Sequence, residues 1–467
     1  MIRTQERPMR VRAAAAMRAL ADWAASPAAR VLPAAVRRRA AIILMDDLGA
    51  MVAGAGEPQV ARSVVRLARA SGAPEATVFA SGAPRLDRAN AAAANGMAIA
   101  WCELDEGFRG APCHAGAYLL PALLAEAEVS GVTVGALLEA LAIAYEITVR
   151  LACAFPFRTM TVHPHAAFAT IGAAAAVSVL RRHDAATLLG SVSGAASMAF
   201  AGPFGHATEG ALVRNAWTAA GAWIGLRAAD WAEDGITGIA ETPHDVFVGS
   251  FGTGVEPDAL TDGLGTTWTM RDGYHKIFAC CQYAHSAVEA SLALYARLDA
   301  VRTAAALEQI VVETHPRGLG LTTVDPATVL AAKFSLPHAA AAVALLGTGG
   351  ADAFSAAALD EAAIAELRRR VRLEPYPAPG APPHDRPARV TWRFRDGMEW
   401  TETCLSARGG VDLPFSEATL VEKFAVNTAR VFPAMAPGLD AILAGAPPAL
   451  AGRWSDAVRA MIRKDAA

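Results

Sequence analysis

The stretch Ala166-Ala-Phe-Ala-Thr-Ile-Gly-Ala-Ala-Ala-Ala-Val-Ser-Val-Leu180 contains no charged residue and would be apolar on every face of a helix. A helix that is hydrophobic all round lies inside a larger body. Its many alanines would let neighbouring helices approach closely. Further runs with helical spacing, or with apolar residues on every face, are Arg37–Val52, Ala91–Cys102, Leu119–Val129, Gly135–Leu151 and Ala211–Ala232. Together these runs predict a large all-helical domain that begins near Ala13 and continues to about Gly265.

The pattern changes near Thr266. Glu308–His315 alternates and is β-branched, as strands are, and Asp396-Gly397 between two alternating segments predicts a hairpin over Val390–Thr401. Ala327–Leu346 and Asp360–Val371 have helical patterns, whereas Glu374–Pro387 holds six prolines and is expected to be irregular. After about Val411 the pattern is helical again. The sequence therefore predicts a mostly α fold with an α/β part, in which residues 1–265 and 412–467 form one helical domain and residues 266–411 form an inserted α/β lid.

The length, charge and composition of the chain limit which classes of function are expected. The chain has 467 residues, which favours two domains, and a net charge of −3. With no basic patch, a nucleic-acid partner is not expected. The uncharged segment Ala185–Gly205 is diluted by serine and glycine, so a buried helix is expected there and no membrane partner. The arginine-rich start, Met1–Arg18, could mark a transit peptide, but it continues into an ordinary helix candidate and a solvated helix is favoured. Six cysteines without a secretory signal predict reduced thiols and a cytoplasmic location.

Reactive side chains are concentrated in four places. Lys276-Ile-Phe-Ala-Cys-Cys-Gln-Tyr-Ala-His285 combines a cation, two thiols and an imidazole. The other three are Glu103-Leu-Asp105-Glu106 with His114, His163-Pro-His165, and Arg214-Asn215. Acids, imidazoles and cations together suit proton transfer on a small anionic molecule.

Each cluster also has a plainer interpretation. His163 and His114 both precede helix candidates, where they could bind an anion or simply cap the helix. The acids that follow the helix candidate ending near Cys102 could have raised pKa values or lie in solvent. Arg214 needs an anionic partner, which could be Asp230 or a substrate carboxylate. Adjacent Cys280 and Cys281 do not match zinc-ligand spacing, so no metal site is expected.

Taken together and in order, these segments resemble the MmgE/PrpD family, which includes 2-methylcitrate dehydratase, cis-aconitate decarboxylase and iminodisuccinate epimerase. The segments that carry the resemblance are Asp46–Gly54, Glu103–Gly116, His163–Gly172, Arg214–Gly238, Lys276–His285 and Lys333–His338. The resemblance implies an all-helical domain with an α/β lid, a pocket between them, a homodimer, and a small polycarboxylate substrate handled without cofactor or metal.

By matching positions, the resemblance places the following residues in the pocket: Glu103, Asp105, His114, His163, Lys276 and His338 as catalytic residues, and Arg214, Cys281 and His285 as substrate-binding residues. The chain departs from the family pattern at Glu103 for Asp, Gly107 for Thr, Arg214 for Lys and His338 for Tyr. The decarboxylase has His where this chain has Cys281. Because arginine does not give up its proton at working pH, Arg214 would only bind a carboxylate, which disfavours decarboxylation.

Three functional hypotheses follow. The leading one is a lyase that removes a proton next to a carboxylate and dehydrates a small hydroxy di- or tricarboxylate similar to 2-methylcitrate. Here Arg214 and Lys276 would bind carboxylates, His114 or His163 would be the base, and Glu103 or His338 would assist hydroxyl loss. The runner-up is an epimerase or isomerase of a small dicarboxylate that uses the same proton abstraction. The third is a non-catalytic relative, suggested by the four departures.

Overall fold

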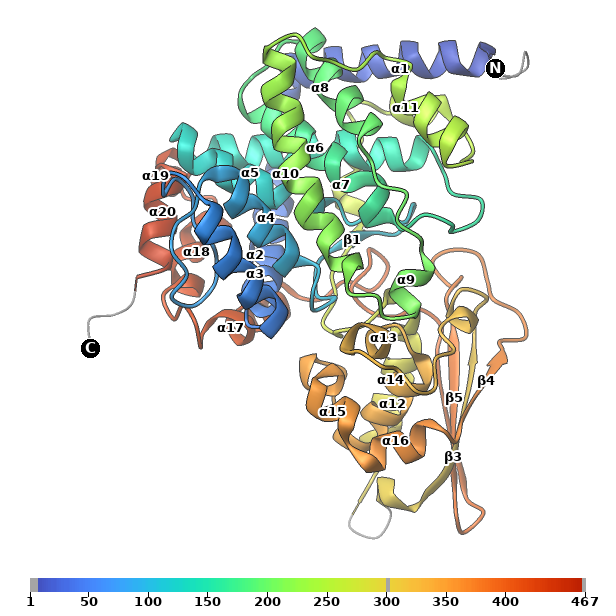
Figure 1. Cartoon of the computed structure of the whole chain (residues 1–467). Coiled ribbons are helices and arrows are strands. Elements are labelled where there is room, and N and C mark those ends of the chain that lie inside the picture. Colours follow the sequence, from blue (N-terminus) through green and yellow to red (C-terminus); the bar gives the residue numbers. More distant parts are fainter. Residues whose placement is uncertain (1–6, 300–302, 464–467) are drawn as a thin grey trace.

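A computed structural model describes residues 7–299 and 303–463. The fold is mostly helical with a smaller α/β part, as the sequence predicted (Figure 1). The main helices of the N-terminal body are α1 (Arg7–Ala25), α2 (Ala34–Ala55), α3 (Pro58–Ala70), α4 (Arg88–Ile99), α5 (Ala115–Ser130), α6 (Val134–Ala154), α7 (Pro164–Leu180), α8 (Ala185–Ser197) and α10 (Val213–Glu233), with short helices α9 (Gly205–Thr208) and α11 (Thr242–His244).

Helix α7 is the centre of this body. All its residues are buried, and it packs against α5, α6, α8 and α10. The close approach of α10 depends on glycine, since a Cβ added at Gly221 or Gly225 would lie 2.4 Å from the Cβ of Ala169 or Ala173. The small residues of α7 therefore do what the sequence indicated: they let helices pack at short range around a charge-free core.

The arginine-rich start belongs to α1. Arg10, Arg12 and Arg18 form ion pairs with Asp245, Asp258 and Glu241 respectively. These pairs give the basic residues a structural role on the surface of the body. Met1–Glu6, which hold Arg3, lie outside the described residues. In residues 7–299 and 303–463, none of the helices has the length and apolar character needed to cross a membrane.

The C-terminal segment returns to the helical body. Helices α17 (Glu417–Thr428) and α18 (Met435–Leu443) pack against α2, while α19 (Pro447–Ala451) and α20 (Trp454–Met461) pack against α6 and α5 (Figure 1). The two ends of the chain thus share one core. The boundaries at 265/266 and 411/412 stay predictions.

The α/β part contains a four-stranded sheet of order β4-β3-β5-β6. Its strands are β3 (Leu307–Thr314), β4 (Val371–Pro375), β5 (Ala388–Phe394) and β6 (Glu399–Cys404). The helices of this part are α12 (His285–Tyr295), α13 (Val329–Lys333), α14 (Leu336–Leu346), α15 (Ala356–Asp360) and α16 (Ala362–Arg368). The predicted hairpin is confirmed: β5 and β6 are antiparallel with Trp392 opposite Trp400, and Gly397 in the turn has a φ of 84°.

Two expectations for this part were wrong. The helix expected over Asp360–Val371 ends at Arg368, and Val371–Pro375 instead forms β4, parallel to β3 at the edge of the sheet. An edge strand tolerates proline because one side of it needs no hydrogen-bond partner. The helix expected over Ala327–Leu346 is interrupted, because Ser335 caps a new helix whose first turn contains Pro337.

A second, two-stranded sheet joins the two parts next to the reactive residues. β1 (Gly107–Phe108) follows the acidic segment, and β2 (Gly273–Tyr274) immediately precedes His275 and Lys276. Gly107 is required here, since a Cβ at this position would lie 2.6 Å from the ring and hydroxyl of Tyr274. This pairing brings residues about 170 positions apart in the sequence into one site.

Candidate active site

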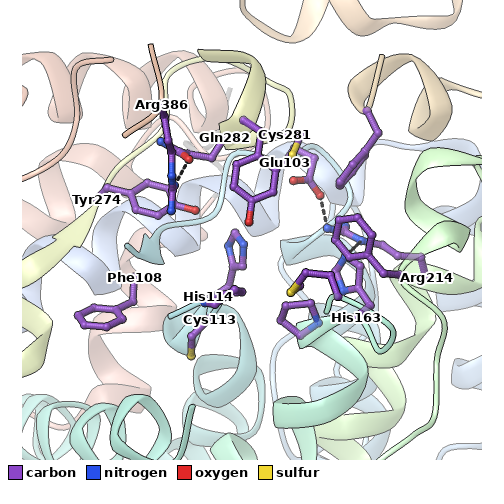
Figure 2. Close-up of a pocket in the computed structure, with 16 residues that line it drawn as sticks. Glu103, Phe108, Cys113, His114, His163, Arg214, Tyr274, Cys281, Gln282 and Arg386 are labelled. Atoms are coloured by element: carbon purple, nitrogen blue, oxygen red, sulfur yellow. Dashed lines mark hydrogen bonds and ion pairs between the residues drawn. The ribbon is translucent and has the colours of Figure 1, made fainter. Parts of the chain in front are cut away.

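A pocket lies where the two parts meet (Figure 2). Its lining comes from the acidic segment, the starts of α5 and α7, α10, and the lid: Glu103, Phe108, Pro112, Cys113, His114, Met160, His163, Pro164, Phe204, Arg214, Tyr274, Cys281, Gln282, Tyr283, Phe334 and Arg386.

The acidic segment Glu103–Glu106 is buried, its carboxyl-bearing side chains included. Helix α4 ends at Ile99, and the chain then turns sharply, with Glu103 at a φ of 55°. Glu103 contacts Arg214 at 2.5 Å and Lys276 at 3.5 Å, and Asp105 contacts Lys276 at 3.2 Å. Buried carboxylates persist only when paired in this way.

These contacts correct the expected partner of Arg214. The arginine pairs with Glu103, whereas Asp230 pairs with Arg88 and Arg181. They also limit the expected role of Lys276 in binding substrate. The lysine is fully buried, does not line the pocket, and donates to Asp105 and Glu103. Burial opposes its charge, but the two carboxylates outweigh burial and raise the pKa of Lys276 above its ordinary value.

His114 stands at the N-cap position of α5 with one ring nitrogen held and the other free. Its Nδ1 lies 2.8 Å from Asp105 Oδ2 and 2.9 Å from the carbonyl oxygen of Glu106. Both neighbours accept hydrogen bonds, so Nδ1 carries the proton. In the neutral ring Nε2 then holds the lone pair, and the side chain lines the pocket (Figure 2).

The carboxyl groups of the segment differ in pKa, where the sequence left raised values or a solvated helix end as the two alternatives. Burial raises the pKa of Glu106 to about 7, even though Gly116 N–H and the Tyr145 hydroxyl donate to its carboxyl group. Burial acts in the same direction on Asp105. There the charges of Lys276 and His114 outweigh it and hold the pKa well below its ordinary value. Asp105 is therefore the ionised partner of His114.

Relative to wild type, the Glu106→Gln variant should be more stable at alkaline pH than it is at acid pH. An unfolded Glu titrates near 4.5 and the folded one at about 7. Between these values only the folded state keeps the proton, so the wild-type free energy of unfolding falls as pH rises and levels off above about pH 7. The pKa difference corresponds to a change on the order of 3 kcal/mol between pH 4 and 8, absent in Glu106→Gln. Urea unfolding of both proteins across this range measures it.

The matched control is Glu126→Gln. Burial opposes ionisation of Glu126, but Arg181 and Arg88 outweigh it and lower the pKa. The control should therefore lose stability relative to wild type as pH rises toward 4.5, with the loss complete above that value, which is the opposite sign. Parallel curves for wild type and Glu106→Gln would contradict the assignment.

His163 occupies the N-cap of α7, as expected, and its Nδ1 accepts from the backbone N–H of His165 at 3.1 Å. Its Nε2 faces Arg214 Nε at 3.3 Å. Burial, followed by the charges of Arg214 and His114, holds the pKa of His163 well below its ordinary value. With its pKa lowered and Nδ1 occupied by the His165 N–H, this ring stays neutral and is poorly placed to take up a further proton.

Of the lid residues predicted for the site, Cys281 lines the pocket and two histidines do not. Burial raises the pKa of Cys281 to about 12, so it is a protonated thiol at neutral pH. His285 begins α12, contacts the Cys280 carbonyl oxygen at 3.2 Å and packs edge-on against Phe278. His338 lies in the lid core, where its two nitrogens contact the Ala353 carbonyl oxygen and Arg368. Neither histidine is among the residues that line this pocket.

The sequence interpretation missed Tyr274, Gln282, Tyr283 and Arg386, all of which line the pocket. Arg386 comes from the proline-rich segment that offered only a loop signal. Arg386 reaches the pocket wall only because the lid packs against the helical body, and no local sequence pattern predicts that packing. Among the described residues, no group of three or more His, Cys, Asp or Glu is arranged to hold a metal ion, and all six cysteines are unpaired.

The acidic segment is held from behind by the C-terminal helix α17. Lys423 Nζ donates to the Leu104 carbonyl oxygen at 2.7 Å and to Asp46 Oδ1 at 2.6 Å. The other carboxylate oxygen of Asp46 contacts His275 at 2.6 Å. Lys423 therefore helps to hold Leu104, which lies between Glu103 and Asp105, and, through Asp46, also His275, which precedes Lys276.

Lys423→Met should lower the free energy of unfolding by about 3 kcal/mol, because it leaves the buried Asp46 with His275 alone. It should also lower kcat, since Leu104 lies between Glu103 and Asp105. Urea unfolding and initial rates measure the two effects. Glu422→Gln, an exposed neighbour on α17, is the control and should be neutral in both. A Lys423→Met protein as stable as the control would refute this anchoring role.

Family models match both parts of the chain: the MmgE/PrpD N-terminal domain over residues 18–254 and the MmgE/PrpD C-terminal domain over residues 278–442. The chain belongs to the MmgE/PrpD family. A cis-aconitate decarboxylase-like protein of Aspergillus oryzae is 28% identical over 439 residues, which cover 87% of this chain and 89% of the relative. Membership of MmgE/PrpD thus rests on both the helical body and the lid, and it indicates an enzyme.

Proposed function

We propose that this MmgE/PrpD protein is a cofactor-independent lyase that removes a proton next to a carboxylate and dehydrates a small hydroxy di- or tricarboxylate. The observation that carries the proposal is the pairing of Asp105 with His114. It places an imidazole on the pocket wall with Nδ1 held by a carboxylate, which leaves Nε2 as the nitrogen that can accept a proton. An ionised carboxylate behind the ring also stabilises the imidazolium that forms when the proton is taken.

The proposed steps use residues of both parts. His114 Nε2 takes the proton from the carbon next to a substrate carboxylate, and the electron pair moves into that carboxylate. Arg214, on the pocket wall, stabilises the resulting negative charge. The electron pair then forms the carbon–carbon double bond as the neighbouring hydroxyl leaves as water. Tyr274 and Cys281, whose pKa values burial raises, are protonated groups on the wall that would supply its proton.

Glu103 does not fit the alternative role of acid that the sequence suggested. Both its oxygens contact cations, Arg214 and Lys276, so it serves to position them. His163 likewise fits a positioning role toward Arg214. This division leaves His114 as the base.

The departures from the family pattern support a working site rather than a non-catalytic relative. Glu103 and Arg214 stand where Asp and Lys are usual, and they contact each other at 2.5 Å. Gly107 stands where Thr is usual, and its missing side chain makes room for Tyr274. Glu103 and Arg214 thus balance each other's charge, and Gly107 and Tyr274 fit each other in shape.

Decarboxylation is the second candidate, favoured by the decarboxylase-like name of the Aspergillus oryzae relative. Arg214 and Cys281 distinguish this chain from the decarboxylase pattern, which is why dehydration is placed first. Epimerisation requires only the proton abstraction, without a leaving group.

One experiment separates these reactions. The purified protein is incubated in deuterated water with citrate, 2-methylcitrate, cis-aconitate and aspartate-derived dicarboxylic acids, and products are followed by mass spectrometry. Loss of water supports the dehydratase, and carbon dioxide release supports the decarboxylase. Deuterium uptake into the substrate without formation of an alkene product supports the epimerase and rejects the dehydratase proposal. Tight binding without any exchange supports a non-catalytic relative.

We also propose that the protein is a homodimer, as its family resemblance suggests, and that it acts in the cytoplasm, as its reduced cysteines suggest. Light scattering coupled to size-exclusion chromatography tests the dimer. A monomer mass at micromolar concentration would overturn it.

A further inference from the structure

The charges around the pocket are unevenly compensated. Arg214 is paired with Glu103, and Lys276 with Asp105 and Glu103. Arg386 also lines the pocket, yet its nearest carboxylate, Asp385, lies 3.5 Å from its Nε. Asp385 is itself engaged by Arg109 at 2.6 Å. Arg386 is therefore the least compensated cation on the pocket wall.

The guanidinium of Arg386 is nevertheless buried and held in place. Its side chain is 9% exposed and lies over the Tyr283 ring. Nη1 donates to the Gln282 side chain, and the Arg386 carbonyl oxygen accepts from Ser286 at 2.6 Å. Nη2 has only a 3.5 Å contact with the Arg109 carbonyl oxygen, and Nε has no hydrogen-bond partner among the described residues. Buried cations are costly without an anionic partner, and a preorganised guanidinium matches a carboxylate.

The position of Arg386 relative to the proposed base is informative. In Figure 2, Arg386 and Arg214 lie on opposite sides of His114. Arg214 comes from the helical body and Arg386 from the lid. An acid with two carboxylates could meet one cation at each side and present the carbon between them to His114.

We propose that Arg386 forms a second carboxylate subsite, so that the ligand carries at least two carboxylates, one held by the body at Arg214 and one by the lid at Arg386. This inference rests on the proposed function and names the residue that selects polycarboxylates over monocarboxylates. The lid subsite also makes binding depend on both parts of the chain. Arg386 additionally lines an outer cavity that shares Phe108 and Pro112 with the inner pocket, which places the subsite on a route to solvent.

The test is binding of tricarballylate, a tricarboxylate without a hydroxyl group, measured by calorimetry. Because this acid cannot be dehydrated, the result does not depend on turnover. Arg386→Gln should weaken its binding about 10- to 100-fold, the effect of losing a charge-assisted bidentate contact. Arg386→Lys, which keeps the charge but lacks the planar fork, should weaken it about 3- to 10-fold and serves if the Gln variant does not fold.

Arg317→Gln is the matched control. Arg317 also lies over Tyr283 but is exposed and does not line the inner pocket, so its variant should bind like wild type. Wild-type affinity in both Arg386 variants would overturn the subsite and leave the proposed reaction standing. Failure of wild type to bind would overturn both. Binding that is lost in the Arg386 variants, without turnover of any acid by wild type, would uphold the subsite and reject the lyase.

Discussion

The His114→Gln variant should lose about 10²- to 10⁴-fold in kcat on whichever acid wild type converts, because general base catalysis contributes this much. Glutamine retains hydrogen bonding near Asp105 and the Glu106 carbonyl oxygen, so the pocket should keep its shape. KM should change little, since His114 is assigned to the proton and not to the carboxylates. Steady-state kinetics measure both constants, and deuterium exchange into substrate should fall in parallel with kcat.

His338→Gln is the control for this experiment. His338 is buried in the lid, outside the pocket, so its variant should retain kcat whatever it loses in stability. If His114→Gln kept most of its activity while His163→Gln lost it, the base would be assigned to the wrong imidazole. Equal rates in all three variants would reject an imidazole base altogether.

The second large effect is expected at Arg214. Arg214→Leu should lower the free energy of unfolding by about 3 to 5 kcal/mol, because it leaves Glu103 buried with only Lys276, at 3.5 Å. The variant should also lose catalytic efficiency, since the cation beside the developing charge is gone. Urea unfolding gives the first quantity, and kcat/KM the second.

A double variant distinguishes the loss of the Arg214–Glu103 ion pair from the cost of leaving Glu103 buried without its partner. Glu103→Met combined with Arg214→Leu removes both charges, and Lys276 keeps Asp105 at 3.2 Å. The double variant should therefore be more stable than Arg214→Leu alone but remain inactive. Arg214→Lys, the residue usual in the family, should preserve most of the stability. A single Arg214→Leu variant as stable as wild type would show that the pair does not hold the acidic segment.

Local patterns predicted most of the fold. Helix α7 could be recognised because fifteen consecutive uncharged residues have no place except a core, and the hairpin because Asp-Gly suits a tight turn. β4 could not be recognised. Its strand pairing is with β3, 57 or more positions earlier, and its last residue is a proline. An edge strand of this kind forms because it pairs with a distant strand, and its own sequence need not show an alternating pattern.

The candidate site divides in the same way. Glu103 and Asp105 could be recognised because charged residues concentrate in one short segment. His163 could be recognised because it precedes Pro164, a residue typical of helix starts. His285 and His338 were expected in the pocket and do not line it, since sequence order does not reveal which way a helix turns its side chains. Arg386 was overlooked because a single arginine in a proline-rich loop has no distinguishing pattern.

By itself, therefore, the sequence determined the helical body, the α/β lid, the family and the set of reactive side chains, since each depends on short-range spacing or on the order of motifs. Only the tertiary structure decided which of those side chains share a pocket and how they are charged. The pairing of Arg214 with Glu103 and the low pKa that Lys276 helps to impose on Asp105 arise from contacts between distant segments. Burial makes such contacts strong, and burial is a property of the packed molecule.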